Sequence, residues 1–140
     1  MTLQFIGDTP AAEMDAVRES VERAAAGLSA FTLNLTRLIA LPERGPKRLI
    51  GAETDAPPTL VELHKRLAQR LARNVRTGSS DRFRPHLTLC RFASPARHFT
   101  IDDPVLAGSF NVDRIALMRS TLWHDGATHH EVVSVTLPPA

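Results

Sequence analysis

The sequence predicts an α+β domain in which antiparallel strands are packed against helices. Three observations support this fold class. Two stretches have the apolar periodicity of helices, several short stretches alternate apolar and polar residues, and turns rich in proline and glycine separate them. The expected order is strand, helix, hairpin, helix and three strands, which favours an α+β domain with an antiparallel sheet and helices packed outside. No linker or low-complexity stretch interrupts the chain, so residues 1–140 are expected to form a single domain.

The N-terminal part is expected to hold a strand over Met1–Gly7 and then a helix. Asp8-Thr9-Pro10 is typical of a helix start, with a capping side chain before a proline at the first helical position. Gly27 stands where the helix would end. The apolar residues that recur at steps of three and four are Met14, Val17, Val21, Ala24 and Leu28.

A hairpin and a second helix are expected next. Phe31–Thr36 alternates apolar and polar residues, a turn with Pro42 and Gly45 follows, and 48–51 forms the returning strand. After Pro57 and Pro58, Thr59 and Glu62 have the spacing of a capping box. The leucines of this helix are Leu60, Leu63, Leu67 and Leu71, and its basic residues are Lys65, Arg66, Arg70 and Arg73. That basic face favours a solvated surface over a phosphate-binding patch.

The C-terminal half is expected to add three strands. Gly78–Asp81 is expected to be a loop, and residues 84–91 form a strand entered through Pro85. Two further strands are expected over Phe110–Met118 and Val132–Leu137.

Composition limits the possible functions. The formal charge of +2 and the pI near 9.3 are compatible with a phosphate-bearing partner without requiring one. Cys90 is the only cysteine, which excludes an intrachain disulfide and a multi-cysteine metal site. No apolar run is long enough to span a bilayer, and no signal peptide is recognisable, so we expect a cytoplasmic protein without a membrane partner.

Two segments of the chain resemble each other. Met1–Ile6 and Leu87–Phe92 both place a threonine second and a leucine third, and both end in an apolar residue. If both are strands related by a pseudo-twofold axis, Thr2 and Thr88 would face each other across a cleft.

The second of these segments follows a histidine. His86 lies two residues before Thr88, so both side chains are expected on one face of the strand. Histidine exchanges protons near neutral pH, and a threonine hydroxyl can donate to a phosphate oxygen. By the same alternation Cys90 is expected on that face, as a small buried residue rather than a nucleophile.

These residues carry a resemblance to a known family. Arg84-Pro85-His86-Leu87-Thr88-Leu89-Cys90-Arg91 and Met1–Gly7 resemble the two His-x-Thr motifs of the 2H phosphoesterases. The similarity is to their RNA 2′,3′-cyclic phosphodiesterase branch, also called the 2′-5′ RNA ligase family, and it covers essentially the whole chain.

The resemblance implies a bilobal fold, with antiparallel sheets about a pseudo-twofold cleft and helices packed outside. It implies hydrolysis of 2′,3′-cyclic phosphates on RNA ends or nucleotides to 2′-phosphates, without metal or cofactor. His86 would be the general base, Thr2 and Thr88 would hold the phosphate oxygens, and Arg91 would add a cation. Because residues alternate along a flat strand, Arg91 can do so only if the strand ends or twists. Ligase activity is left open.

The sequence departs from the family pattern at one place. The histidine of the first motif would stand immediately before Met1, and the strand–helix segment that leads into it is also missing. We therefore expect a member lacking its N-terminal segment and impaired in catalysis, with no obligate protein partner and monomeric when full length. The alternative is a degenerate, non-catalytic module that binds RNA or nucleotides.

A second histidine cluster suggests different chemistry. His124, Asp125, His129 and His130 could be combined into a metal site, but no matched scaffold supplies a further ligand. A solvated turn is favoured there.

Overall fold

A computed structural model describes residues 1–71, 83–105, 108–124 and 126–140. The chain divides into two compact units. The first, which we call the sheet unit, comprises Met1–Leu3, Thr32–Pro57 and Val75–Phe110. The second, the helical unit, comprises Gln4–Phe31, Pro58–Asn74 and Asn111–Ala140. The single domain that the sequence predicts therefore consists of two bodies, each with its own core.

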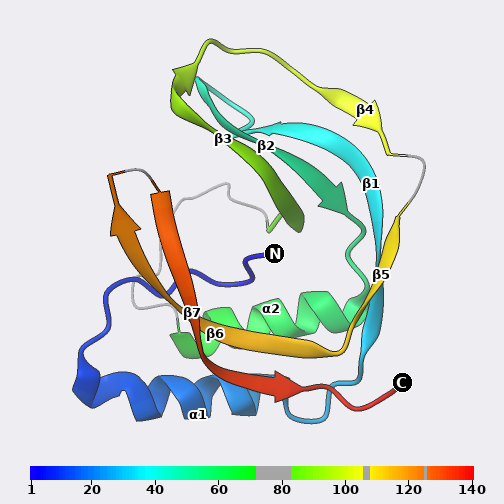
Figure 1. The fold of residues 1–140 in the computed structure, drawn as a ribbon. Coiled ribbons are helices and arrows are strands. Elements are labelled where there is room, and N and C mark those ends of the chain that lie inside the picture. The colour runs from blue at the N-terminus through cyan, green and yellow to red at the C-terminus, as the bar shows by residue number, and fades with distance from the viewer. Residues whose placement is uncertain (72–82, 106–107, 125) are drawn as a thin grey trace. The chain divides into compact units, whose positions relative to one another are not determined.

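The sheet unit is built on an antiparallel sheet with the strand order β3-β2-β1-β4 (Figure 1). Its strands are β1 (Phe31–Leu41), β2 (Lys47–Thr54), β3 (His86–Ala96) and β4 (Asp102–Pro104). A further strand, β5 (Ser109–Val112), pairs with β1. The buried apolar side chains of this unit are Leu33, Ile39, Ala40, Leu49 and Ala52.

The turn between β1 and β2 is stabilised by hydrogen bonds from a buried lysine. Lys47 is only 1% exposed, and its ammonium group donates to the carbonyl oxygens of Pro42 and Glu43, each at 2.7 Å. These bonds offset part of the cost of burying the charge. The predicted hairpin is confirmed, and both of its strands are longer than expected.

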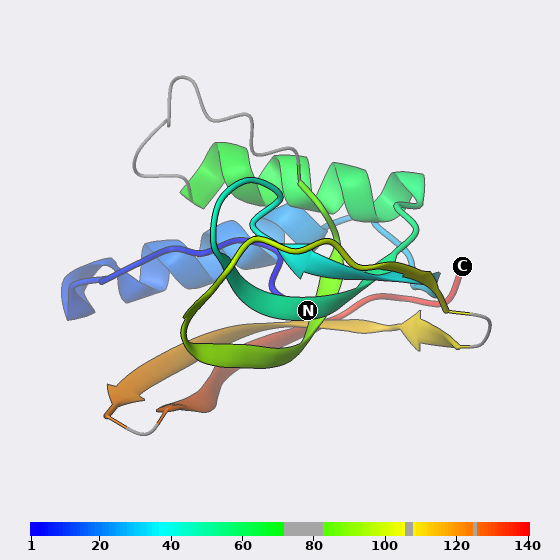
Figure 2. The same cartoon turned by 90° about the horizontal axis from the view of Figure 1, so that it is seen from above.

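The helical unit contains η1 (Ala11–Glu13), α1 (Met14–Ala25), α2 (Pro58–Leu71), β6 (Arg114–Trp123) and β7 (Gly126–Thr136). Helix α1 packs against α2 and against the ribbon of β6 and β7 (Figure 2). Arg66 of α2 donates to the carbonyl oxygen of Ala26 at 2.8 Å, and so satisfies a polar group at the end of α1. The predicted apolar stripes line the core, which includes Val17, Val21, Ala24, Leu28, Leu60, Leu63, Leu67 and Leu71.

Several boundaries differ from the predictions. Residues 1–7 form no strand, because within the described residues they join no ladder, and Phe5 remains 80% exposed. The helix start is also different: Pro10 precedes a 3₁₀ turn that has no side-chain cap, and the Thr9 hydroxyl donates to the Gly7 carbonyl instead. Helix α2 begins at Pro58, before the expected capping box.

The C-terminal strands differ in a similar way. The strand expected over Phe110–Met118 is divided at Asp113 into β5 and β6, and β7 begins six residues earlier than expected, at Gly126. Strand β4 was not expected. The expected Gly78–Asp81 loop and the helix residue Arg73 lie outside the described residues. None of the described helices is long and apolar enough to cross a membrane.

Candidate active site

His86 is the first residue of β3 and is partly buried. Its Nδ1 lies 2.7 Å from the carbonyl oxygen of Arg84. A carbonyl oxygen can only accept a hydrogen bond, so Nδ1 must carry the proton. The neutral ring then has a lone pair on Nε2, and that nitrogen can accept a proton from a substrate or water.

The register between β2 and β3 decides which side chains share a face with His86. Glu53 pairs with His86 and Gly51 pairs with Thr88, and the register then shifts, so that Ile50 pairs with Cys90. Leu89 is therefore an extra residue, a β-bulge in β3. Because directly paired residues share a face and β2 alternates regularly, His86 and Thr88 lie on the face of Gly51 and Glu53.

The bulge changes the predicted position of two residues. Arg91 pairs with Leu49, which lies on the same face of β2 as Gly51. Arg91 thus comes to the face of His86 and Thr88, which a flat strand would not allow. Cys90 pairs with Ile50 and turns to the opposite face, so the expectation that it shares the face of His86 is wrong. Cys90 is also exposed, not buried.

Thr88 and Arg91 are exposed, and among the described residues neither side chain has a hydrogen-bond or ion-pair partner. A hydroxyl and a guanidinium are thus available to an anion beside His86. Thr2 is exposed too and belongs to the same compact unit as β3. It lies in irregular chain, so the prediction that Thr2 and Thr88 sit on two equivalent strands is wrong.

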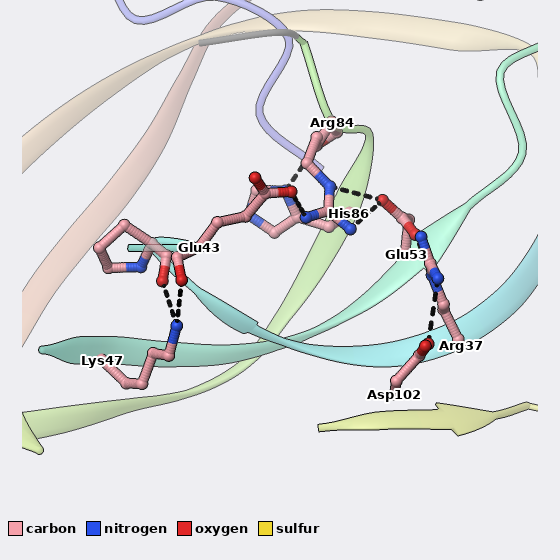
Figure 3. A network of polar contacts seen from close by, with 8 residues as sticks. Arg37, Glu43, Lys47, Glu53, Arg84, His86 and Asp102 are labelled. Atoms are coloured by element: carbon pink, nitrogen blue, oxygen red, sulfur yellow. Dashed lines mark hydrogen bonds and ion pairs between the residues drawn. The ribbon is translucent and has the colours of Figure 1, made fainter. Parts of the chain in front are cut away.

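A network of ion pairs fixes the side chain of Arg84, the residue whose carbonyl oxygen contacts His86 (Figure 3). The guanidinium of Arg84 contacts the Glu53 carboxylate at 2.6 and 2.7 Å and also pairs with Glu43. Glu53 accepts a second hydrogen bond, from Arg37 at 2.6 Å, and Arg37 in turn contacts Asp102 at 3.0 Å. Glu53 therefore links β1, β2 and the chain that enters β3. It fixes the guanidinium of Arg84, and the carbonyl oxygen of Arg84 in turn orients the imidazole of His86.

The network keeps its central carboxyl ionised. Partial burial alone would raise the pKa of Glu53, but the hydrogen bonds from Arg37 and Arg84 and their charges outweigh it, so the pKa is lowered. The pKa of Arg37 is raised, chiefly by its hydrogen bonds to Glu53 and Asp102.

Gly51 provides the surface on which the His86 ring lies. A Cβ atom built on Gly51 would stand 3.1 Å from Cδ2 of His86 and 3.1 Å from the carbonyl oxygen of Leu87. Ordinary carbon–carbon contacts are about 3.5–4.0 Å. Any side chain at position 51 would thus displace the imidazole or the backbone of β3.

A cavity of about 440 Å³ opens beside this network. Arg37, Glu43, Lys47, Arg84 and Asp102 supply its charged lining, and Ile39, Ala40, Thr100 and Ile101 complete it. The cationic side chains there already have carboxylate or carbonyl partners.

Sequence reasoning identified His86, Thr88 and Arg91 but missed the residues that position them. Glu53 and Gly51 carry no local signal, since their role depends on strand pairing. The chain contains a second His-x-Thr spacing, His98-Phe99-Thr100. It lies in the connection between β3 and β4, where His98 is exposed.

Comparison with known proteins decides the family. Residues 1–122 match the family model described as the 2′-5′ RNA ligase superfamily. The chain belongs to this superfamily. A search of curated proteins found no significant match.

Solved structures of the superfamily have the same fold. TT0787 of Thermus thermophilus superposes with a TM-score of 0.79 at 26% identity, over 99% of this chain and 77% of that one. E. coli LigT in its apo form gives a TM-score of 0.76 at 25% identity, over 98% and 74%. LigT has also been solved with 3′-AMP and with phosphate. The α+β fold with antiparallel sheets is therefore the fold of 2H phosphoesterases, as the resemblance implied.

Proposed function

We propose that this chain acts on RNA ends or nucleotides that carry a 2′,3′-cyclic phosphate and converts them to 2′-phosphates. The observation that carries the proposal is the hydrogen bond from His86 Nδ1 to the Arg84 carbonyl, since it leaves Nε2 as a base. The common face of His86, Thr88 and Arg91 supports it. We place the activity in the cytoplasm, where a lone exposed cysteine such as Cys90 stays reduced.

In the proposed reaction, a water molecule attacks phosphorus while His86 Nε2 takes one of its protons. The bond between phosphorus and O3′ breaks, and O3′ takes a proton from an acid. Thr88 and Thr2 donate hydrogen bonds to the non-bridging oxygens, and Arg91 offsets the charge that develops on them. The family pattern assigns the acid to a histidine, which would correspond to the position immediately before Met1.

A second candidate function is binding without turnover. The observation that favours it is that the Thr88 hydroxyl and the Arg91 guanidinium, which would hold a phosphate, are exposed and have no partner among the described residues. Such a protein would retain 2′-AMP affinity through Thr88 and Arg91 but would hydrolyse cyclic phosphates poorly.

Two measurements on the chain test these proposals. Calorimetry with 2′-AMP reports binding, and chromatography of 2′,3′-cyclic AMP reactions reports hydrolysis. Replacing His86 by alanine should lower turnover by about a hundredfold to ten-thousandfold, the usual contribution of a general base. His98→Ala is the matched control, because His98 belongs to the other His-x-Thr sequence. Equal losses in both variants, or a product with a 3′-phosphate, would refute the assignment. Binding of 2′-AMP with no turnover would favour the second candidate.

A further inference from the structure

The outer part of the β6–β7 ribbon carries an unusual set of side chains. Beyond a register shift between Leu117 and Met118, Arg119 pairs with His130, Thr121 with Thr128, and Trp123 with Gly126. Paired residues share a face and successive residues alternate. These six residues therefore form one face of the ribbon, which we call the tryptophan face.

Register and contacts agree on this division. The intervening pair, Ser120 and His129, is joined by a hydrogen bond of 2.8 Å between the hydroxyl and Nδ1, as residues sharing the opposite face should be. That opposite face also carries Leu122, Met118 and Glu131.

The indole on the tryptophan face is open to a ligand. Trp123 is 61% exposed, and its cross-strand partner is a glycine, which has no side chain to cover it. A Cβ built on Gly126 would meet nothing within 4 Å, so the space beside it is empty. In Figure 1 the tip of the ribbon projects away from α1 and α2 of its own unit.

The charge of the tryptophan face indicates which class of partner it binds. Its described residues include Arg119 and His130 but no carboxylate, and neither side chain has an ion-pair partner among the described residues. The acidic residue of strands β6 and β7, Glu131, lies on the other face and pairs with Arg114 at 3.3 Å. Exposed aromatic rings beside cations bind single-stranded nucleic acids, because bases stack on the ring and phosphates pair with the cation.

We propose that the tryptophan face binds single-stranded RNA, with a base stacked on Trp123 and a phosphate paired with Arg119. This inference rests on the proposed function, in which the substrate is an RNA end, and adds contacts to nucleotides other than the one that reacts. An apolar protein partner would need a wider patch, and here the second large apolar side chain, Leu122, points to the opposite face.

The chain carries its own probe for this contact. Trp123 is the only tryptophan and there is no tyrosine, so the intrinsic fluorescence comes from this one side chain. A short single-stranded RNA with a 2′-phosphate end should quench the emission, whereas 2′-AMP should bind without quenching it. Trp123→Ala should weaken oligonucleotide binding, followed by fluorescence anisotropy of a labelled RNA, by about tenfold. It should leave 2′-AMP affinity and turnover of 2′,3′-cyclic AMP unchanged.

Two further variants separate stacking from charge. Arg119→Ala should weaken binding and reduce the slope of log affinity against log salt by about one. Leu122→Ala, on the opposite face, should have no effect.

Three results would overturn the inference. One is oligonucleotide binding without quenching. Another is equal damage from Leu122→Ala and Trp123→Ala. The third is a blue shift with phosphatidylserine vesicles and no response to RNA, which would assign the face to a lipid surface. If 2′-AMP binds and RNA length makes no difference, only this inference fails. If 2′-AMP also fails to bind, the proposed function fails with it.

Discussion

Gly51→Ala is the most direct perturbation of the candidate active site. The added methyl group would stand 3.1 Å from Cδ2 of His86, about 0.4–0.9 Å closer than ordinary carbon–carbon contact. The ring cannot tilt freely, because Nδ1 is held by the Arg84 carbonyl at 2.7 Å. Nor can the methyl group move toward the sheet, where the carbonyl oxygen of Leu87 is also 3.1 Å away. The imidazole must therefore shift by about half an ångström to restore ordinary contact.

This shift can be converted into an expected loss of rate. A misplacement of about 1 Å can cost about a hundredfold, so half of it should lower turnover of 2′,3′-cyclic AMP about tenfold. Stability should change by less than about 2 kcal/mol, because the relief of glycine's chain entropy in a strand, about 0.5–1 kcal/mol, opposes the crowding.

The assay compares turnover with the side-chain NMR signals of His86 in the same samples. The Cδ2–H resonance of His86 should move in Gly51→Ala. Ala52→Ser is the matched control, because it adds one atom at the next, buried position of β2, on the opposite face. Turnover that survives Gly51→Ala unchanged while the resonance moves would show that the position of His86 does not limit the reaction. Equal loss in Ala52→Ser would show that general damage to β2 is responsible.

Three other expectations follow from the same geometry. Glu53→Gln should destabilise the chain at neutral pH by about 1–3 kcal/mol, since Arg84 and Arg37 lose their shared carboxylate. The pKa of Glu53 is lowered, so its stabilisation is fully present above its ordinary value near 4.5 and is lost as the pH falls through the lower folded value. The variant's thermal midpoint should accordingly depend less on pH below about 4.5, and an unchanged acid profile would contradict the network. Placing a histidine immediately before Met1 should raise turnover relative to a glutamine at the same place; equal rates would remove the assigned acid. Cys90→Ser should leave turnover unchanged, because the β3 bulge turns Cys90 away from His86, and a large loss would show that the register is wrong.

The sequence predicts the elements of this fold better than their boundaries. The leucine and valine stripes identify α1 and α2 because burying one face dominates helix stability. Local capping signals were less informative: Thr9 bonds to Gly7, and Glu62 bonds to Arg66 at 2.8 Å rather than serving a capping box. Whether Met1–Gly7 forms a strand could not be predicted from its own residues, since a strand also needs a neighbouring strand to pair with.

The candidate site shows the same limit. The motif around His86 was visible because the chemistry depends on particular side chains at a fixed spacing. Glu53 and Gly51 were not visible, because they lie more than 30 residues from His86 and reach it only through β2–β3 pairing. The face on which Arg91 lies could not be predicted without knowing of the β-bulge, and no residue type in Leu87–Cys90 indicates a bulge.

The extra residue, Leu89, shifts the alternation of side chains along β3 by one residue. On either side of it the strand alternates normally, but the two parts are out of step, so an odd spacing joins Thr88 and Arg91 on one surface. A pattern search that demands strict alternation would assign Arg91 to the wrong side. Removing Leu89 would leave Cys90 opposite Ile50 and Arg91 opposite Leu49, so a chain one residue shorter could present the same surface through regular alternation. Straightening the bulge at constant length would instead exchange the thiol and the guanidinium. The threonine and the arginine can therefore share one face at a spacing of three residues with the bulge, or at a spacing of two residues without it. Conversely, a spacing of three residues can place the arginine on either face, depending on whether the bulge is present.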